Sequence, residues 1–360
     1  MATHVELGDR GYTVHYRSLE HLPELLQEEE LRVGKCLLVS DENVAAHYRS
    51  PLVHQLENAG WTVRPIVLPP GEETKSADAL QTIYDDALAW GIDRQTPVLA
   101  LGGGVIGDLA GFAAATLLRG LPLVHLPTSL LAQVDASVGG KTAINHETGK
   151  NLIGAFYQPR LVCTDPSVLD TLPMREYTSG MAEVVKHALI RDVELLTFLE
   201  ENLVPILSRR DRDAIAETIE RAVEVKAHVV SADERETGER VVLNFGHTFA
   251  HAIESVAGYG TFSHGEAVAL GMRAALYLSH QRHPDTIPRE RAVELVRALP
   301  VEPDPSALEF DALYDAMRSD KKNEGETIQF VLLDRLGHAY VTGDLRRPEV
   351  QRAWEFACKG

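Results

Sequence analysis

The sequence predicts an α/β protein whose N-terminal part is a doubly wound parallel sheet and whose C-terminal part is mostly α-helical. Short apolar, strand-like runs alternate with helical segments in the first part, which is the pattern of parallel strands joined by crossover helices. A glycine-rich turn follows the most apolar run, and after residue 173 long helical patterns replace the alternation. Because 360 residues exceed the usual size of a single core, we expect two domains, at 1–172 and 173–360.

The elements of the first domain follow from alternation and apolar runs. Residues 3–16 alternate around Gly-Asp-Arg-Gly and predict a hairpin. The buried strands expected after it span 35–40, 62–68, 97–101 and 161–165. Helices are expected at 21–31, at 52–58, from a polar loop at 69–76 to about Trp90, and at 109–118. Thr74 or Ser76 can cap the third of these helices.

The second domain shows the longer period of helices. The expected helices span 179–190, 193–202, 211–231, 244–256, 265–280, 289–299 and 311–319. Two late runs, 327–333 and 339–342, predict a hairpin.

Composition excludes several classes of function. A formal net charge of −18 argues against nucleic acid as a partner, because no basic stripe is present to neutralise phosphates. No apolar run reaches membrane-spanning length and the N-terminus lacks the apolar core of a signal peptide, so we expect no membrane and a cytoplasmic location. Three widely spaced cysteines favour neither a disulfide scaffold nor a thiolate metal site, and Cys36 and Cys163 are expected in the core.

A dinucleotide fingerprint marks the most apolar stretch of the chain. Gly102, Gly104 and Gly107 have the spacing GxGxxG, directly after an apolar strand and before an Ala-rich helical run. Glycines there let the backbone approach a pyrophosphate, and the N–H groups at the helix start favour negative charge. The context therefore predicts a Rossmann-like nucleotide-binding turn.

Two glycine–lysine turns follow the fingerprint, at 138–141 and 149–151. Such turns expose backbone N–H groups and place an ammonium beside them, which suits phosphate or carboxylate. Either lysine alone is equally explained by a solvated loop. Three glycine-bearing turns in one apolar stretch favour a site for an anionic ligand.

The helical half carries polar side chains that suit a metal site. Glu183 shares a helix face with Lys186 and His187, while His247 and His251 are one turn apart and His264 opens a later helix. Two imidazoles and a carboxylate on separate helices can form an open three-ligand metal site. Spacing does not choose which two of the four histidines would bind. Hydrogen-bonded histidines at a helix start, and His264 as a capping residue, are the alternative hypotheses.

The motifs together carry a family resemblance. GGGVIGDLAGFAAATLLRG, LPTSLLAQVDASVGGKTAIN, GKNLIGAFYQP, GMAEVVKHALI, SADERETG, LNFGHTFAHAIE, HGEAVALGM and DKKNEG resemble the 3-dehydroquinate synthase family of sugar-phosphate cyclases. The resemblance implies an N-terminal NAD-binding domain, a C-terminal metal-binding domain and an active site between them. It implies conversion of 3-deoxy-D-arabino-heptulosonate 7-phosphate to 3-dehydroquinate and phosphate, with NAD consumed and regenerated, a zinc or cobalt ion, and a homodimer.

The resemblance also assigns residues. It implies Glu183, His247 and His264 as metal ligands, His251 as an acid/base or phosphate-contacting group and Glu236 as a proton acceptor. The implied substrate contacts are Arg119, Asp135, Lys141, Asn151, Lys186, Lys226, Arg240, Asn244 and one of Lys321 or Lys322. The implied NAD contacts are Asp41, Pro70, Gly71, Glu72, Glu73, Thr74, Lys75, Gly104, Val105, Ile106, Gly107, Asp108, Thr128, Ser129, Lys141, Lys150, Val168, Leu169, Asp170 and Thr171.

Three other functions remain open on the sequence. Another sugar-phosphate cyclase would share most motifs, but Asn244 and the turn at 320–322 favour dehydroquinate synthase within the resemblance. A metal-dependent polyol dehydrogenase would share the two-domain plan and release NADH in net amount. A non-catalytic paralogue is disfavoured by the intact Glu183, Lys186 and His247.

Overall fold

The computed structural model describes residues 1–258, 260–319 and 327–359. The chain forms two compact units: unit 1 contains Met1–Leu172 and Lys226–Arg235, and unit 2 contains Pro173–Val225 and Glu236–Gly360. The predicted boundary at residue 172 had assigned the segment Lys226–Arg235 to the second, helical domain. It belongs to unit 1 because its polar side chains find partners there, as in the ion pair between Arg10 and Glu234 at 2.6 Å.

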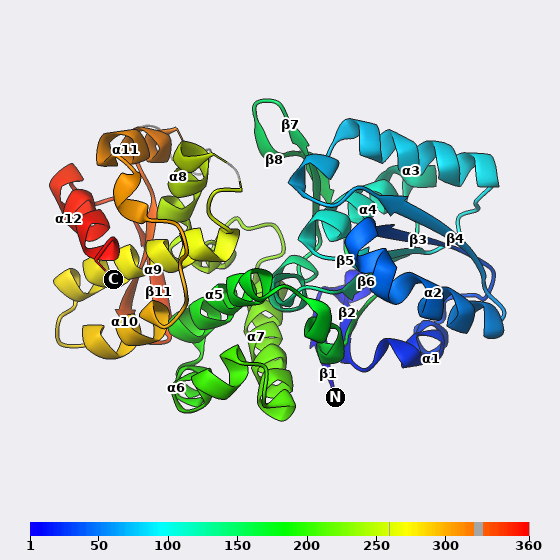
Figure 1. Cartoon of the computed structure of the whole chain (residues 1–360), viewed down its shortest axis with the longest axis horizontal. Helices are drawn as coiled ribbons and strands as arrows, with labels where there is room; N and C mark the ends of the chain where they lie inside the picture. The colour runs from blue at the N-terminus through cyan, green and yellow to red at the C-terminus, as the bar shows by residue number, and fades with distance from the viewer. Residues whose placement is uncertain (259, 320–326, 360) are drawn as a thin grey trace. The chain divides into compact units, whose positions relative to one another are not determined.

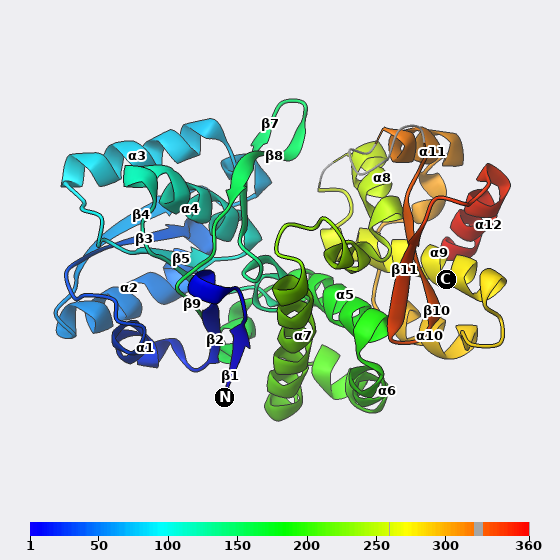
Figure 2. The same cartoon turned by 180° about the vertical axis from the view of Figure 1, so that it is seen from behind.

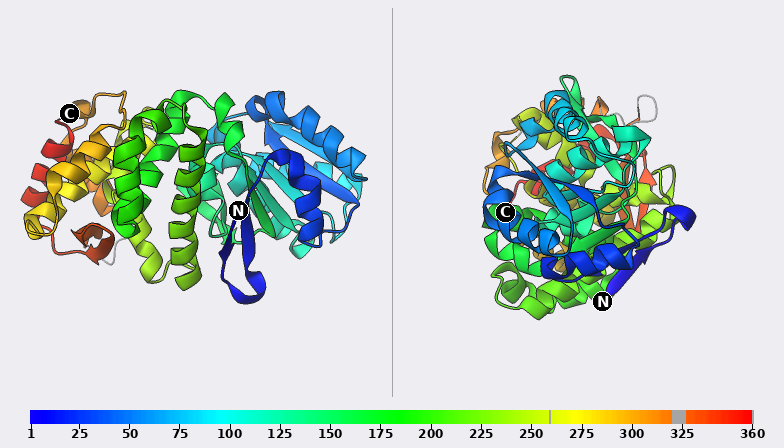
Figure 3. Two further views of the ribbon diagram at one scale, coloured as in Figure 1. Left: turned by 90° about the horizontal axis from the view of Figure 1, so that it is seen from below. Right: turned by 90° about the vertical axis from the view of Figure 1, so that its right-hand side faces the viewer.

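Unit 1 is built on a seven-stranded sheet with the order β1-β2-β9-β6-β5-β3-β4. From β2 to β4 all neighbouring strands are parallel, and only β1 pairs antiparallel, with β2. The hairpin of β1 and β2 projects in the left view of Figure 3. The expected α/β class and N-terminal hairpin are thus confirmed. The strands are β1 (Ala2–Val5), β2 (Tyr12–Tyr16), β3 (Lys35–Asp41), β4 (Thr62–Leu68), β5 (Val98–Gly102), β6 (Leu123–Pro127) and β9 (Leu161–Thr164).

Helices cover both faces of this sheet (Figure 1). On β3, Leu37 and Val39 pack in a core with α3 (Ala77–Trp90) and α4 (Gly104–Thr116). The alternate residues Cys36 and Leu38 pack on the other face, with the helices α1 (Leu22–Glu28) and α2 (Glu42–Asn58). Side chains of a strand point alternately to its two faces, so one apolar run serves both cores. Cys36 and Cys163 are buried in this second core, as expected.

Several elements of unit 1 differ from the expected ones. Helix α2 begins earlier, at Glu42, because the carboxylate of Asp41 accepts hydrogen bonds from the N–H groups of Asn43 (2.9 Å) and Val44 (3.1 Å). The glycine–lysine turns adjoin an antiparallel hairpin that we did not expect, β7 (Lys141–His146) and β8 (Gly149–Phe156). Figure 2 shows this hairpin extending away from the main sheet. Ser76 caps α3, accepting a hydrogen bond from Ala79.

Unit 2 is mostly helical, as expected. Its central helix α9 is almost entirely buried and contacts α5, α8, α10 and α12. The terminal helix α12 was not predicted, whereas the late hairpin β10–β11 was. The elements are α5 (Met174–Arg191), α6 (Val193–Leu207), α7 (Arg212–Ala232, which ends in unit 1), α8 (His247–Ala257), α9 (His264–Arg282), α10 (Arg289–Arg297), α11 (Phe310–Arg318), β10 (Phe330–Arg335), β11 (His338–Thr342) and α12 (Arg347–Ala357).

Among the helices in the described part of the chain, none combines the length and the apolarity that crossing a membrane requires.

Candidate active site

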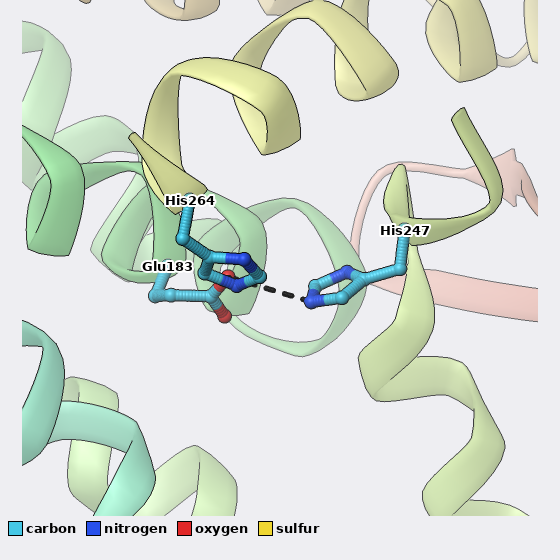
Figure 4. A group of neighbouring side chains, drawn as sticks. All are labelled: Glu183, His247 and His264. Atoms are coloured by element: carbon cyan, nitrogen blue, oxygen red, sulfur yellow. Dashed lines mark ion pairs between the residues drawn. The ribbon is translucent and has the colours of Figure 1, made fainter. Parts of the chain in front are cut away.

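Three helices of unit 2 bring a carboxylate and two imidazoles together. Glu183 lies in α5 and is fully buried, and His247 and His264 are the first residues of α8 and α9. Glu183 Oε1 lies 3.7 Å from His247 Nε2 and 3.5 Å from His264 Nε2. One ligand atom from each residue lies within 4.8 Å of the other two (Figure 4).

The starts of α8 and α9 position the two imidazoles. Gly246 takes a left-handed conformation, with φ 83°, directly before α8. At α9 a capping box sets the start: Glu266 N–H donates to Ser263 Oγ at 3.3 Å, and Ser263 N–H donates to the Glu266 carboxylate at 2.7 Å. The alternative hypothesis that His264 itself caps this helix is therefore wrong, because Ser263 occupies that position.

Each imidazole is oriented through its second nitrogen. His247 Nδ1 lies 3.3 Å from the carbonyl oxygen of Phe245, and His264 Nδ1 lies 3.6 Å from Glu254 Oε2. Both contacts leave Nε2 directed toward Glu183. Histidines that bind metals are commonly held in this way by a carbonyl or a carboxylate. Glu254 was missed by sequence reasoning, although it lies two helical turns after His247 on the same helix.

The cluster combines the carboxylate of Glu183 with an ammonium and two imidazoles. The ammonium of Lys186, itself buried, pairs with Glu183 Oε2. Burial and the nearby Lys186 lower the pKa of His247 well below its usual value, so this ring is neutral. Burial by itself lowers the pKa of His264, but hydrogen bonds to Glu183 and Glu254 raise that pKa to about 10. A metal ion binding at His264 Nε2 would therefore displace a proton.

The arrangement fits a divalent metal ion. Two ligand atoms on one tetrahedral ion, each about 2.1 Å from it, lie about 3.4 Å apart. The distances of 3.5 and 3.7 Å between Glu183 Oε1 and the two Nε2 atoms are close to this value. Of the four candidate histidines, His247 and His264 share this cluster with Glu183, and His187 of the same helix also has a ring nitrogen within 4.8 Å of a Glu183 oxygen. The ring of His251 stacks edge-on against His247, with centroids 5.6 Å apart.

Other predicted residues of unit 2 lie close to α8 in the sequence. Asn244 donates a hydrogen bond of 2.7 Å to Glu236 Oε1. Arg240 is buried in the short helix Glu239–Asn244 that precedes α8. Lys321 and Lys322 lie outside the described residues.

In unit 1 the glycine turn leads directly into the start of α4. The residue at the N-cap of α4 is Gly103. It has no side chain, so it cannot accept hydrogen bonds from the first N–H groups of the helix through one. Buried Lys75 pairs with Asp108 of α4 and with the side-chain oxygen of Asn151 in β8. Burial raises the pKa of Asp108, although the ammonium of Lys75 opposes this.

The remaining predicted residues of unit 1 are placed on several elements. Thr128 N–H donates to Gly102 O at 3.0 Å, and Ser129 Oγ accepts from Ala132 N–H at 3.2 Å. Asp135 pairs with Lys226. Lys141 opens β7 and Lys150 lies in β8. The segment with Val168, Leu169, Asp170 and Thr171 forms a short helix, Pro166–Thr171, in which Thr171 Oγ1 is 2.6 Å from the Tyr48 hydroxyl.

Backbone strain marks three of the predicted site residues. Arg119, Asn151 and Glu236 have φ of 68°, 57° and 58°. Left-handed conformations cost free energy in residues other than glycine, and they concentrate at functional sites. The sequence carried no signal of this strain.

Solved structures with the same fold define the class of the protein. The chain resembles 2-epi-5-epi-valiolone synthase from Streptomyces hygroscopicus, solved with NAD+ and Zn2+, with a TM-score of 0.85, 28% identity and 96% of each chain covered. It equally resembles 2-deoxy-scyllo-inosose synthase solved with NAD+ and Co2+, with a TM-score of 0.85, 26% identity, and 98% of this chain and 99% of that one covered. The fold is therefore that of the sugar-phosphate cyclases.

Sequence comparison then gives the family. Residues 65–179 match the model of the 3-dehydroquinate synthase N-terminal domain, and residues 180–323 match that of the C-terminal domain. The 3-dehydroquinate synthase of Salinibacter ruber is 70% identical over 358 residues, covering 99% of this chain and 98% of the relative. That of Methylococcus capsulatus is 49% identical over 341 residues, covering 93% of each. The chain belongs to the 3-dehydroquinate synthase family.

Proposed function

We propose that this chain converts 3-deoxy-D-arabino-heptulosonate 7-phosphate to 3-dehydroquinate and inorganic phosphate, the second step of the shikimate pathway. The proposal is carried by one observation: Glu183, His247 and His264 form a compact cluster in a chain 70% identical to a 3-dehydroquinate synthase. The same fold with a nucleotide-binding glycine turn supports the use of NAD. The reaction would take place in the cytoplasm.

Glu183, His247 and His264 would hold the divalent ion of unit 2. One carboxylate and two imidazoles, with the proton of His264 displaced on binding, suit zinc, or cobalt in its place. When bound, such an ion acidifies a coordinated hydroxyl and polarises a neighbouring carbonyl. Lys186, whose ammonium pairs with Glu183, would also contact an anionic group of the substrate.

The other polar residues of unit 2 would complete the substrate site. Arg240 and Asn244 would bind substrate, together with Lys321 or Lys322. Glu236, which Asn244 already contacts, would accept a proton, and His251 would act as an acid/base group or contact the phosphate. Arg119, Asp135, Lys141, Asn151 and Lys226 would be the substrate contacts supplied by unit 1.

Unit 1 would hold the nucleotide. The first N–H groups of α4 would face the pyrophosphate, where the helix dipole favours negative charge. Asp41, the loop from Pro70 to Lys75, the pair Thr128–Ser129, Lys150 and the segment 168–171 would form the rest of its contacts. When bound, NAD would supply a reversible hydride exchange with the C5 alcohol of the substrate.

The chemistry explains why no net oxidation is expected. Oxidation at C5 makes the adjacent C–H bond acidic, so phosphate can leave by elimination. After reduction of the C5 carbonyl back to the alcohol, the ring would open and an aldol reaction would close the carbocycle. Each turnover releases one phosphate and leaves the nucleotide oxidised.

An assay with the heptulosonate phosphate tests this proposal. Protein loaded with zinc and NAD is expected to release phosphate and 3-dehydroquinate in equal amounts, with no lasting NADH absorbance. Chelator-treated protein is the control and should release none. Stoichiometric NADH would identify a dehydrogenase instead, and turnover only of a sugar phosphate without a carboxylate would identify another cyclase.

We infer that the protein forms a homodimer through the β7–β8 hairpin. Leu152, Ile153 and Phe156 of β8 are 48%, 42% and 44% exposed, which is unusual for three large apolar side chains on one short strand. Sedimentation velocity is expected to show a dimer at micromolar concentration, and Leu152→Lys combined with Phe156→Lys, two positions of even spacing on one face of β8, to shift it to a monomer. A wild-type protein that sediments only as a monomer would refute the inference.

A further inference from the structure

Asn145 lies at an irregular point of the β7–β8 hairpin, where the register shifts between Ile144 and His146. It is half-buried and uses three of its polar groups. Its backbone N–H donates to Lys75 O at 2.8 Å, and its side-chain Nδ2 donates to Glu72 Oε1 at 2.7 Å. Its Oδ1 accepts from Asn151 N–H at 3.0 Å. A β-bulge of this kind re-aims a side chain out of the regular ladder.

These bonds join the β7–β8 hairpin to a loop that is distant in the sequence. Glu72 and Lys75 belong to the loop between β4 and α3, and Asn151 belongs to β8. Lys75 in turn pairs with Asp108 in α4 and with the side chain of Asn151. The backbone of Asn151 is held in a left-handed conformation by the bond that it donates to Asn145. Asn145 therefore stands at the centre of a network that fixes the loop and the hairpin to each other.

We propose that Asn145 is a positioning residue for nucleotide binding: it holds the loop around Glu72 and Lys75, and the strained Asn151, in the arrangement that the nucleotide requires. This proposal rests on the proposed use of NAD by unit 1. Asn145 is not itself placed among the groups that touch the nucleotide. Its effect reaches the nucleotide through Glu72 and Lys75, and Asn151 contributes by accepting a hydrogen bond from Lys75.

The side chain of Asn145 suits this role because an amide donates and accepts at once. An aspartate at the same place would still accept from Asn151 N–H, but it would face the carboxylate of Glu72 at hydrogen-bond distance. Like charges so close repel, so the loop would move away from the hairpin. A glutamine in place of Glu72 could donate to that aspartate and restore the bond with its direction reversed.

Four variants test the proposal in the full-length, zinc-loaded protein. Dissociation constants for NAD are measured by calorimetry for Asn145→Ala, Asn145→Asp, Glu72→Gln and the double variant Glu72→Gln/Asn145→Asp. We expect Asn145→Ala to weaken NAD binding about 10-fold, the size of one or two lost hydrogen bonds, and Asn145→Asp to weaken it at least as much. The double variant should return to within about 3-fold of Glu72→Gln, because the pair is coupled. Thr148→Ala, in the turn of the same hairpin, should bind as the wild type.

Hydrogen exchange of the nucleotide-free protein gives a second measurement. The amides of residues 72–76 and 151 should be protected in the wild type and in Thr148→Ala, and should exchange faster in Asn145→Ala. Wild-type NAD affinity in Asn145→Ala, or a double variant no better than Asn145→Asp alone, would overturn the proposal. If the wild type binds no NAD, the proposed function fails instead, while the exchange rates still decide whether Asn145 orders these segments.

Discussion

Replacement of Glu183 by alanine is expected to abolish both metal binding and catalysis. The variant loses the carboxylate that faces both imidazoles, and it leaves the ammonium of Lys186 buried without its partner. Removing one partner of a buried ion pair costs about 3–5 kcal/mol. We expect the free energy of unfolding to fall by about that amount, and kcat to fall at least ~10³-fold, since a bound ion supplies several kcal/mol of transition-state stabilisation. Urea unfolding and metal analysis of dialysed protein measure the two effects.

A second variant separates stability from function at this position. In Glu183→Gln combined with Lys186→Met, neither partner carries a charge, so most of the lost stability should return while metal content and activity stay absent. Lys186→Met alone should keep a measurable share of the metal, because Glu183, His247 and His264 remain. Stoichiometric zinc in Glu183→Ala would exclude Glu183 as a ligand.

Local sequence patterns were sufficient for most of the fold. The apolar run of β3 predicted a buried strand, and its neighbouring residues Cys36 and Leu37 lie in opposite cores. Local sequence patterns did not predict the structure where contacts between residues distant in the sequence determine it. The residues around 138–141 and 149–151 were interpreted as two separate glycine–lysine turns. In the structure, residues 141–156 form the antiparallel hairpin β7–β8. The segment Lys226–Arg235 continues a helical pattern, and only its partners, such as Asp135 and Arg10, show that it belongs to unit 1.

The same limit applies to the candidate site. Spacing within one helix predicted that Glu183 and Lys186 share a face, and they form an ion pair. Spacing did not choose between His187, His251 and the two histidines of the cluster, because that choice depends on how α5, α8 and α9 approach one another. Two glycines of α9, Gly265 and Gly271, allow the helix to pack closely against its neighbours. The place of a Cβ on Gly265 lies 2.2 Å from Ser179 O, and that of a Cβ on Gly271 lies 2.0 Å from Gly246 O.

Gly265→Ala is therefore expected to disrupt the cluster without changing any of its three residues. The new methyl group would lie 2.4 Å from the Cα atom of Ser179, so α9 must move away from α5 by about 1 Å to reach an acceptable contact. The N–H of Gly265 also donates to Ser179 Oγ at 2.9 Å, a bond that the same movement would lengthen. His264 adjoins Gly265 and moves with it. We expect metal affinity to fall about 100-fold or more and the free energy of unfolding to fall by about 2–3 kcal/mol.

Three measurements give this prediction a specific signature. Gly34→Ala, where the nearest atom to the new methyl group is 3.9 Å away, is the matched control and should behave as the wild type. In cobalt-loaded protein, Gly265→Ala and Gly271→Ala should both alter the visible absorption of the ion, since the first displaces His264 relative to Glu183 and the second displaces His247. Unchanged metal affinity and spectrum in Gly265→Ala would show that the cluster does not depend on the close packing of α5 against α9. The distance of 3.5 Å between Glu183 and His264 would then have to be held by the side chains themselves, through Glu254 and Lys186.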